Sequence, residues 1–237
     1  DRTVSNISLK NTQRAGSVEI DPSNKLAAVA QMGPPNFVAF IDIGTGRESH
    51  PAVSVASVPQ SLKFSSDGKF VFVAEGDRIQ VIDVAARTVA ATILNPIAGS
   101  NLSGIGRAKI NNEELMFVAD RNNPRLFIIK VSDRSVVKAC QGGDNAGRSC
   151  NADAECPSSS CGPAIVNLAG YGNPQNIVID ENLNRAYIRM FASGVVVAVD
   201  LNTREVVDDI SLVTSGRGLN ISMGGKYVLA DYTDNIV

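Results

Sequence analysis

The fold of this chain is decided by the stretch LKFSSDGKFVFVA (Leu62–Ala74), in which two apolar segments flank an Asp-Gly pair. Glycine accepts a positive φ at little cost, so Asp-Gly between two strand-like segments predicts a β-hairpin. A third apolar segment, IQVIDV (Ile79–Val84), follows after a short polar link. The turn Ala85–Arg87 then leads into a fourth segment, TVAATI (Thr88–Ile93). Together these segments predict an antiparallel meander of four strands within about 40 residues.

The same unit recurs along the whole chain. Matching turns at Arg47, Arg87, Arg134 and Arg204 follow one another at intervals of 40, 47 and 70 residues, and the last interval holds one repeat plus an insertion. The expected repeats are residues 17–57, 58–98, 99–170 and 171–213, with a fifth made of 214–237 plus 1–16. Four-stranded repeats of about 40–45 residues are typical of a β-propeller. A β-sandwich with accidental internal similarity is the alternative, and the regular phase of the turn argues against it.

The repeat resembles that of the YVTN family of β-propeller proteins. Phe70–Ala74 and Val81–Val84 match the family's Val-rich second strand and its Val-Ile-Asp third strand. Lys130 replaces that Asp in the third repeat, and Gly224-Gly225 replaces the Asp-Gly turn in the fifth. The resemblance covers most of the chain outside a Cys-rich segment. It implies an all-β propeller of four-stranded antiparallel blades and leaves the function open.

The ends of the chain bear on the number of blades. Arg2–Leu9 is similar to Arg87–Leu94, so it reads as an outer strand whose partners would come from the C-terminal repeat. Residues 1–237 are then a single propeller domain with about five visible blades. The propeller is either closed with five blades or part of a larger one, such as a seven-bladed propeller.

Composition excludes several functional classes. The chain has 22 Lys and Arg against 24 Asp and Glu, a net charge of −2, which predicts no binding of nucleic acid because such binding depends on clustered cations. No apolar run reaches the roughly 20 residues of a membrane span. His50 is the only histidine among 237 residues. We therefore expect no His-based catalysis, no metal site built on histidines and no cofactor, and we assign no catalytic residue.

All four cysteines, Cys140, Cys150, Cys156 and Cys161, fall in one Gly- and Ser-rich segment, the Cys-rich insertion (residues 140–163). The even number of cysteines and the scarcity of apolar side chains predict two disulfides, in any of three pairings. A four-thiolate zinc site is the alternative, but the Cys-x-x-Cys pairs of such sites are absent. Disulfides indicate an oxidising compartment: the exterior, the cell surface or the periplasm.

The insertion is expected at the rim of the propeller. It follows Arg134–Ala139, which has the position of an outer strand, and precedes Ala164–Leu168, which reads as a second outer strand. A projecting, cross-linked segment suits contact with a partner, and local stapling is the alternative role.

A calcium loop in the same segment is not supported. Asn151, Asp153 and Glu155 alternate as at the start of an EF-hand loop. Such a loop needs glycine at its sixth position and an acid at its twelfth, where Cys156 and Gly162 stand instead. We predict no metal here.

A second candidate site lies at the mouth of the channel, where loops lead into the first strand of each blade. Gln60, Arg107, Gln175 and Arg217 align within one residue in these loops. A ring of amides and guanidiniums could hold a small anion or a carboxylate-bearing partner. Solvated loop residues are the alternative interpretation.

Three functional hypotheses follow. The first is an exported, non-catalytic propeller that binds a protein partner or itself as a scaffold. The second is an enzyme or electron-transfer subunit, such as a lactonase or a quinone- or haem-dependent oxidoreductase, with its active residues outside this chain. The third is a structural subunit of a surface layer or filament. Asn6, Asn101 and Asn220 begin Asn-x-Ser sequons, which matter only in a host that glycosylates.

Overall fold

A computed structural model of the chain describes residues 7, 9, 14–49, 51–191, 193–212, 218–222 and 227–230. These residues form antiparallel sheets and one short 3₁₀ turn, η1 (Asp153–Glu155). The chain divides into two compact units, Asp1–Leu94 and Asn95–Val237. The predicted outer strand Arg2–Leu9 lies almost entirely outside the described residues.

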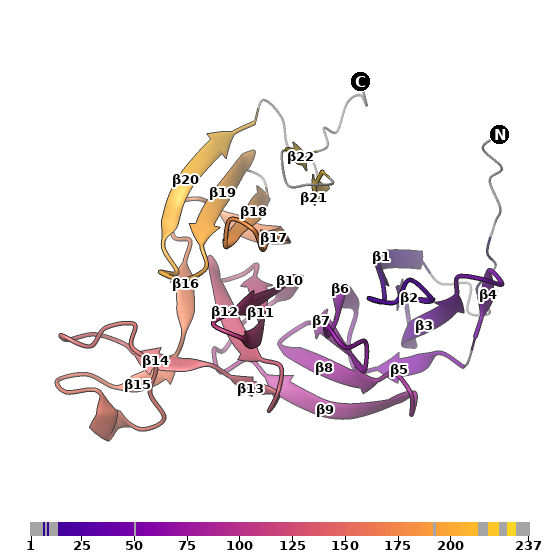
Figure 1. Cartoon of the computed structure of the whole chain (residues 1–237), viewed down its shortest axis with the longest axis horizontal. Helices are drawn as coiled ribbons and strands as arrows, with labels where there is room; N and C mark the ends of the chain where they lie inside the picture. Colours follow the sequence, from indigo (N-terminus) through magenta and orange to yellow (C-terminus); the bar gives the residue numbers. More distant parts are fainter. Residues whose placement is uncertain are drawn as a thin grey trace. The chain divides into compact units, whose positions relative to one another are not determined.

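The first unit contains two four-stranded blades (Figure 1). Blade 1 consists of β1 (Arg14–Ile20), β2 (Leu26–Met32), β3 (Asn36–Asp42) and an outer strand in two pieces, β4 (Arg47–Glu48) and β5 (Val53–Val55). Blade 2 consists of β6 (Pro59–Phe64), β7 (Phe70–Glu75), β8 (Arg78–Asp83) and β9 (Thr88–Leu94). Each blade is a meander in which every strand pairs with the next one along the chain.

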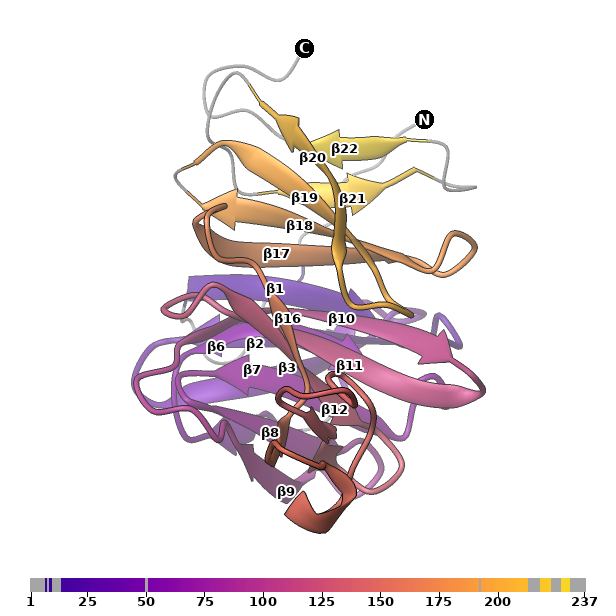
Figure 2. The same ribbon diagram turned by 90° about the vertical axis from the view of Figure 1, so that its left-hand side faces the viewer.

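The second unit repeats this plan (Figure 2). Blade 3 consists of β10 (Leu102–Ile110), β11 (Glu113–Asp120), β12 (Arg125–Lys130) and an outer strand in two pieces, β13 (Ser135–Val136) and β16 (Ile165–Asn167). Blade 4 consists of β17 (Asn173–Asp180), β18 (Arg185–Phe191), β19 (Val195–Asp200) and β20 (Val206–Ser211). A hairpin of β21 (Leu219–Ile221) and β22 (Val228–Ala230) contacts β17, and β14 (Lys138–Cys140) pairs with β15 (Cys161–Pro163) inside the insertion.

Burial explains why the middle strands read as continuous apolar runs. Residues 71–75 of β7 and 79–82 of β8 are all buried, whereas β9 is exposed along most of its length. A middle strand is covered on both faces, so both sets of alternating side chains are largely apolar, with Glu75 and Gln80 as the polar exceptions in these two strands. An outer strand has one face in water and shows no such run.

The hairpin between the first two strands of each blade follows the predicted turn chemistry. Gly68, of the predicted Asp-Gly pair, has a φ of 72°, and asparagines take the left-handed positions in the other blades: Asn24, Asn111, Asn112 and Asn184. Asparagine tolerates this region better than other residues with a Cβ. The turn signal in these four repeats is confirmed.

The turn before the outer strand corrects one prediction. Its left-handed residue is Arg87 (φ 57°), Arg134 (φ 59°) and Arg204 (φ 64°) in blades 2 to 4. In blade 1 this residue is Gly46 (φ 64°), so the match of Arg47 to Arg87 was wrong by one position. Arg47 instead pairs with Asp42 as the first residue of β4.

The side chain of Arg87 joins two blades. Its guanidinium lies 3.8 Å from the centre of the Phe40 ring in β3, and its Nη2 lies 3.5 Å from the Ser49 hydroxyl. A cation over an aromatic face contributes about 0.5–2 kcal/mol. Arg87 therefore fastens blade 2 to blade 1.

Inner strands of neighbouring blades approach closely through small residues. The Ser103 hydroxyl donates a 2.9 Å hydrogen bond to the Pro174 carbonyl, from β10 to β17. A Cβ at Gly104 would lie 2.4 Å from the Gln175 carbonyl oxygen. Gly104 is thus required by the backbone of the next blade. In the first unit, Lys63 of β6 and Glu19 of β1 form a 2.7 Å ion pair.

Candidate functional site

The Cys-rich insertion interrupts the outer strand of blade 3. Val136 at the end of β13 pairs with Ile129 of β12, and Ile165 at the start of β16 pairs with Phe127 of the same strand. The predicted second outer strand, Ala164–Leu168, is therefore confirmed as β16, and it continues the first strand on the same partner. The insertion leaves from the outer edge of blade 3 (Figure 1).

The other blades show an irregularity at the same point of the outer strand. In blade 2 the register shifts between Val89 and Ala91, and in blade 4 between Val206 and Asp208. Extra residues at a bulge are tolerated because the ladder resumes beyond them. The insertion thus enlarges a bulge that the repeat already has, and it leaves the sheet register intact.

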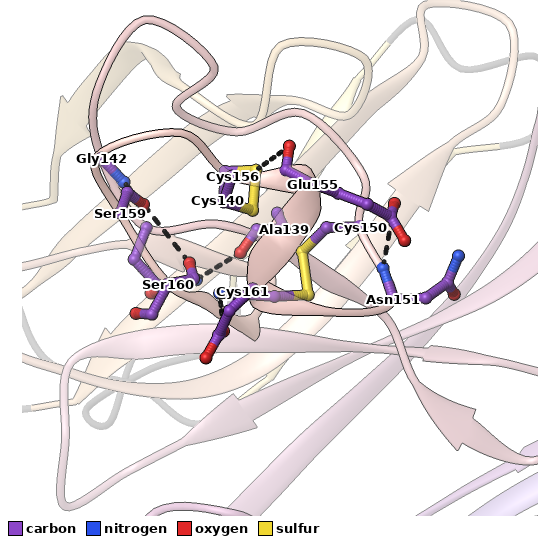
Figure 3. Close-up of a disulfide and its surroundings, with 12 residues drawn as sticks. Ala139, Cys140, Gly142, Cys150, Asn151, Glu155, Cys156, Ser159, Ser160 and Cys161 are labelled. Atoms are coloured by element: carbon purple, nitrogen blue, oxygen red, sulfur yellow. Dashed lines mark hydrogen bonds between the residues drawn. A yellow bond between two sulfur atoms is a disulfide. The ribbon is translucent and has the colours of Figure 1, made fainter.

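Two disulfides hold the insertion together (Figure 3). Cys140 is bonded to Cys156 and Cys150 to Cys161, so the two loops they close interlock along the chain. Cys140 and Cys161 stand opposite each other in the β14–β15 pair, and each bonds to a cysteine outside that pair. All four sulfurs are oxidised, which leaves no thiolate for the alternative zinc site.

The acids of the insertion serve its own backbone. The Asp153 carboxylate accepts a 2.7 Å hydrogen bond from the Cys161 amide, and the Glu155 carboxylate accepts one of 3.3 Å from the Asn151 amide. Gly142 donates to the Ser159 hydroxyl at 2.9 Å (Figure 3). The acid alternation that resembled a calcium loop therefore has a structural use in closing the loop.

Two pockets flank the base of the insertion. One, of about 330 Å³, lies between the insertion and the turn of blade 4, and Cys140, Gln141 and Ala164 face Asn202, Thr203 and Arg204 across it. The other, of about 280 Å³, is lined by charged residues of blade 3 and by the insertion, among them Glu113, Lys130 and Lys138. Lys130, which stands where the other repeats have Asp, forms an ion pair with Glu113 in this pocket.

Arg204 is a further candidate for function, and its position in the repeat did not predict this. It is half-buried, and burial lowers the pKa of its guanidinium below the ordinary value for arginine. No ion pair among the described residues includes it. The sequence shows Arg204 only as a turn residue, because the pocket exists only where the insertion meets that turn.

The four residues predicted at the channel mouth occupy different settings. Gln60 and Gln175 both stand at a register shift near the start of the first strand, so their alignment holds in the structure. Gln60 is exposed and Gln175 half-buried. Arg217 lies outside the described residues.

Arg107 lies elsewhere in its blade. It is in the middle of β10, opposite Met116, and its Nε is 3.8 Å from the Glu114 carboxylate. The register shift that matches Gln60 falls at Ser103–Gly104, so Arg107 was placed too early in the repeat. Its guanidinium already faces an acid of its own hairpin, which weakens the case for an anion there.

Sequence reasoning also missed two buried acids. Glu75 and Asp120 end the second strand of blades 2 and 3, and both are fully buried. Asp120 accepts hydrogen bonds from the Ser100 hydroxyl and the Asn101 amide, and Glu75 accepts a 3.0 Å bond from the Ser57 amide. Both acids fix the segment that leads into the first strand. The other oxygen of Glu75, Oε1, makes no hydrogen bond with described residues.

Replacing Glu75 by glutamine should change how stability depends on pH. Burial raises the pKa of Glu75, so the folded state binds its proton more tightly than the unfolded chain does. The stability this group contributes is present below the ordinary glutamate pKa and is lost as pH rises through the folded value. We expect the wild type to lose stability relative to Glu75→Gln as the pH rises above the ordinary pKa of glutamate, as measured by urea unfolding at each pH.

Glu181, exposed in the β17–β18 turn, provides the control, because Glu181→Gln should leave the pH profile unchanged. A flat difference between the wild type and Glu75→Gln, or a wild type that gains stability as pH rises, would contradict the prediction.

The remaining residues singled out in the sequence are the sequon asparagines and His50. Asn101 is half-buried and the hydroxyl of its sequon residue Ser103 is engaged, whereas Asn220 is exposed in β21. Asn6 and His50 lie outside the described residues. No helix within the described ranges has the length and apolar character needed to cross a bilayer.

Comparison with known protein families and with curated proteins finds no match to this chain. Solved structures share its fold. Hydrazine synthase of Kuenenia stuttgartiensis aligns with a TM-score of 0.66 at 14% identity, over 94% of this chain and 58% of that chain. The β-propeller domain of Cps50 (Swd1) from Myceliophteria thermophila aligns with a TM-score of 0.65 at 13% identity, over 97% of this chain and 65% of that one. The chain therefore has the predicted β-propeller fold and spans less than two thirds of each of these chains.

Proposed function

We propose that this chain is an exported β-propeller of the YVTN type that binds a protein partner through its Cys-rich insertion, without catalysis. The observation that carries this proposal is the insertion itself. It is cross-linked by two disulfides and built out from an outer strand whose register it leaves undisturbed. A segment with so little core of its own depends on such cross-links for a fixed shape.

Rigidity favours binding over a purely local role. A pre-ordered loop loses little conformational entropy when a partner docks, which raises affinity. Blades 2 and 4 complete the same outer strand with only a bulge, so blade 3 does not need the insertion to form its sheet. The disulfides further support export to an oxidising compartment, at the cell surface, in the periplasm or outside the cell.

The test uses a variant that removes the insertion together with the few residues that flank it. Replacing residues 137–164 by Ala90-Ala91, the residues at this place in blade 2, joins Val136 to Ile165 in the register of an ordinary bulge. A photo-cross-linking amino acid at the exposed Asp144 should form a defined adduct with one exported protein of the host, or with a second copy of the chain. The same amino acid at Leu183, exposed in the β17–β18 turn, should not.

Competition decides the outcome. Excess unlabelled wild type should abolish the Asp144 adduct, and the insertion-free variant, shown to be folded by its circular dichroism and cooperative unfolding, should not. Equal competition by both proteins, or the absence of any specific adduct at Asp144, would rule out the insertion as the binding element.

A further inference from the structure

The 330 Å³ pocket at the base of the insertion has one charged residue in its lining. Arg204 faces walls made by uncharged residues, among them Cys140, Gln141 and Ala164. The Gln141 amide group is already used, because its Nε2 donates to the carbonyls of Ala139 and Pro163. A half-buried cation thus lines a cavity that offers it no counter-charge.

The acid that begins the turn carrying Arg204 is committed elsewhere. Asp200 accepts hydrogen bonds from the amides of Asn202 and Thr203, and Arg185 is the cation whose charge acts on it. Asp200 therefore organises the turn that carries Arg204 without neutralising it.

Arg87 occupies the same turn position in blade 2 and shows a purely structural role for an arginine there. Arg87 stacks on the Phe40 ring and meets the Ser49 hydroxyl in the gap of the blade 1 outer strand. In blade 3 the position of Phe40 is taken by Ile128, which is fully buried and has no aromatic face. The gap in the outer strand is filled there by the insertion. Arg204 keeps the turn position of Arg87 and has lost its stacking partner.

We propose that this pocket binds a carboxylate on Arg204, supplied by an acidic side chain of the protein partner. This proposal rests on the proposed function and names the chemistry of its contact. Guanidinium and carboxylate match in geometry and make charge-assisted hydrogen bonds. One cation balances one negative charge, so a carboxylate fits better than a doubly charged phosphate, whose second charge would stay uncompensated in a partly buried site.

The walls of the pocket fit the rest of an acidic side chain. Pro163, Ala164 and Ile165 offer apolar surface for the methylene groups of a glutamate, beside the guanidinium that takes its head. The Cys140–Cys156 disulfide fixes this wall of the pocket, which faces Arg204. Arginine in a partly desolvated pocket is also the kind of residue that dominates protein interfaces.

The experiment follows backbone amide shifts of Gly147, Ala164 and Arg204 in the ¹⁵N-labelled full chain during titration. The probes are N-acetyl-Gly-Glu-Gly-amide, its Gln counterpart, sodium propionate and sodium phosphate. We expect saturable shifts at these amides with the Glu peptide and none with the Gln peptide. The Arg204→Gln variant should bind the Glu peptide at least about tenfold more weakly, whereas Arg47→Gln, at an exposed arginine beside the matching turn of blade 1, should bind as the wild type does.

The insertion-free variant is the second test, because it keeps Arg204 and removes the facing wall; it should also lose binding. Equal binding of the Glu and Gln peptides, retention of binding by Arg204→Gln or tighter binding of phosphate would overturn the carboxylate assignment. Propionate as tight as the peptide would overturn the assignment to a protein side chain. If the Asp144 adduct forms while the Glu peptide fails to bind, this inference falls and the proposed function stands.

Discussion

We expect the Gly104→Ala variant to unfold about 1–3 kcal/mol more easily than the wild type, a typical cost for an overpacked site. The added Cβ would lie 2.4 Å from the Gln175 carbonyl oxygen and 3.1 Å from its carbon. Both atoms belong to the backbone of the neighbouring blade, which the Ser103–Pro174 hydrogen bond holds in place. The clash can be relieved only by moving β10 away from β17. Urea or thermal unfolding measures the loss.

Alanine substitutions at two other glycines serve as graded controls for this prediction. Gly106→Ala places its Cβ 2.8–2.9 Å from side-chain carbons of Ile177 and Ile179, which can shift, so its effect should be smaller. Gly44→Ala meets its nearest atom, an Asp42 carboxylate oxygen, at 3.5 Å and should be close to neutral. If the Gly104→Ala variant is as stable as the Gly44→Ala variant, β10 and β17 do not approach each other as closely as described.

Reduction of the disulfides should unfold the insertion and spare the blades. Closing a loop of about 15 residues stabilises a folded segment by roughly 3 kcal/mol, and the two bonds here span sequence separations of 16 and 11 residues. The buried side chains within the insertion are chiefly the cysteines themselves. Amide protection in residues 140–163 should therefore fall on the order of a hundredfold on reduction, as measured by hydrogen exchange.

Single-bond variants test which cross-link matters more. The Cys140→Ala/Cys156→Ala pair opens the longer loop, so it should lose more protection than Cys150→Ala/Cys161→Ala. Strands β7 and β11 report on the blades and should exchange as before in both. Cooperative unfolding of these strands on reduction would show that the insertion holds the blade together, against the proposed role in binding.

The repeat was readable from sequence where local chemistry dictates the structure. The Asp67-Gly68 turn and the buried middle strands follow from backbone freedom and two-sided burial, which each repeat expresses within a few residues. The starts of the first strands were not readable in the same way. Polar and Gly-rich segments such as Ser103–Gly106 resemble loops, and they are strand residues because the next blade approaches them closely.

The same distinction between local and inter-blade effects applies to the candidate site. The positions of the four cysteines predicted disulfides, while their pairing depends on how β14 and β15 face each other. Arg204 and Arg87 look alike in sequence. Their difference lies in what the preceding blade offers, Phe40 in one case and the insertion in the other. Such a difference arises between blades, and no local pattern encodes it.

The bulge in the outer strands is also a site where we expect this protein to accept an inserted foreign peptide. Blade 3 holds a long insertion at this point while β13 and β16 keep their places on β12. The matching point of blade 2, at Ala90, lies in an exposed outer strand and is already out of register. We expect a peptide epitope spliced in there to be displayed on the outer strand of blade 2, with the meander of β6, β7 and β8 unchanged.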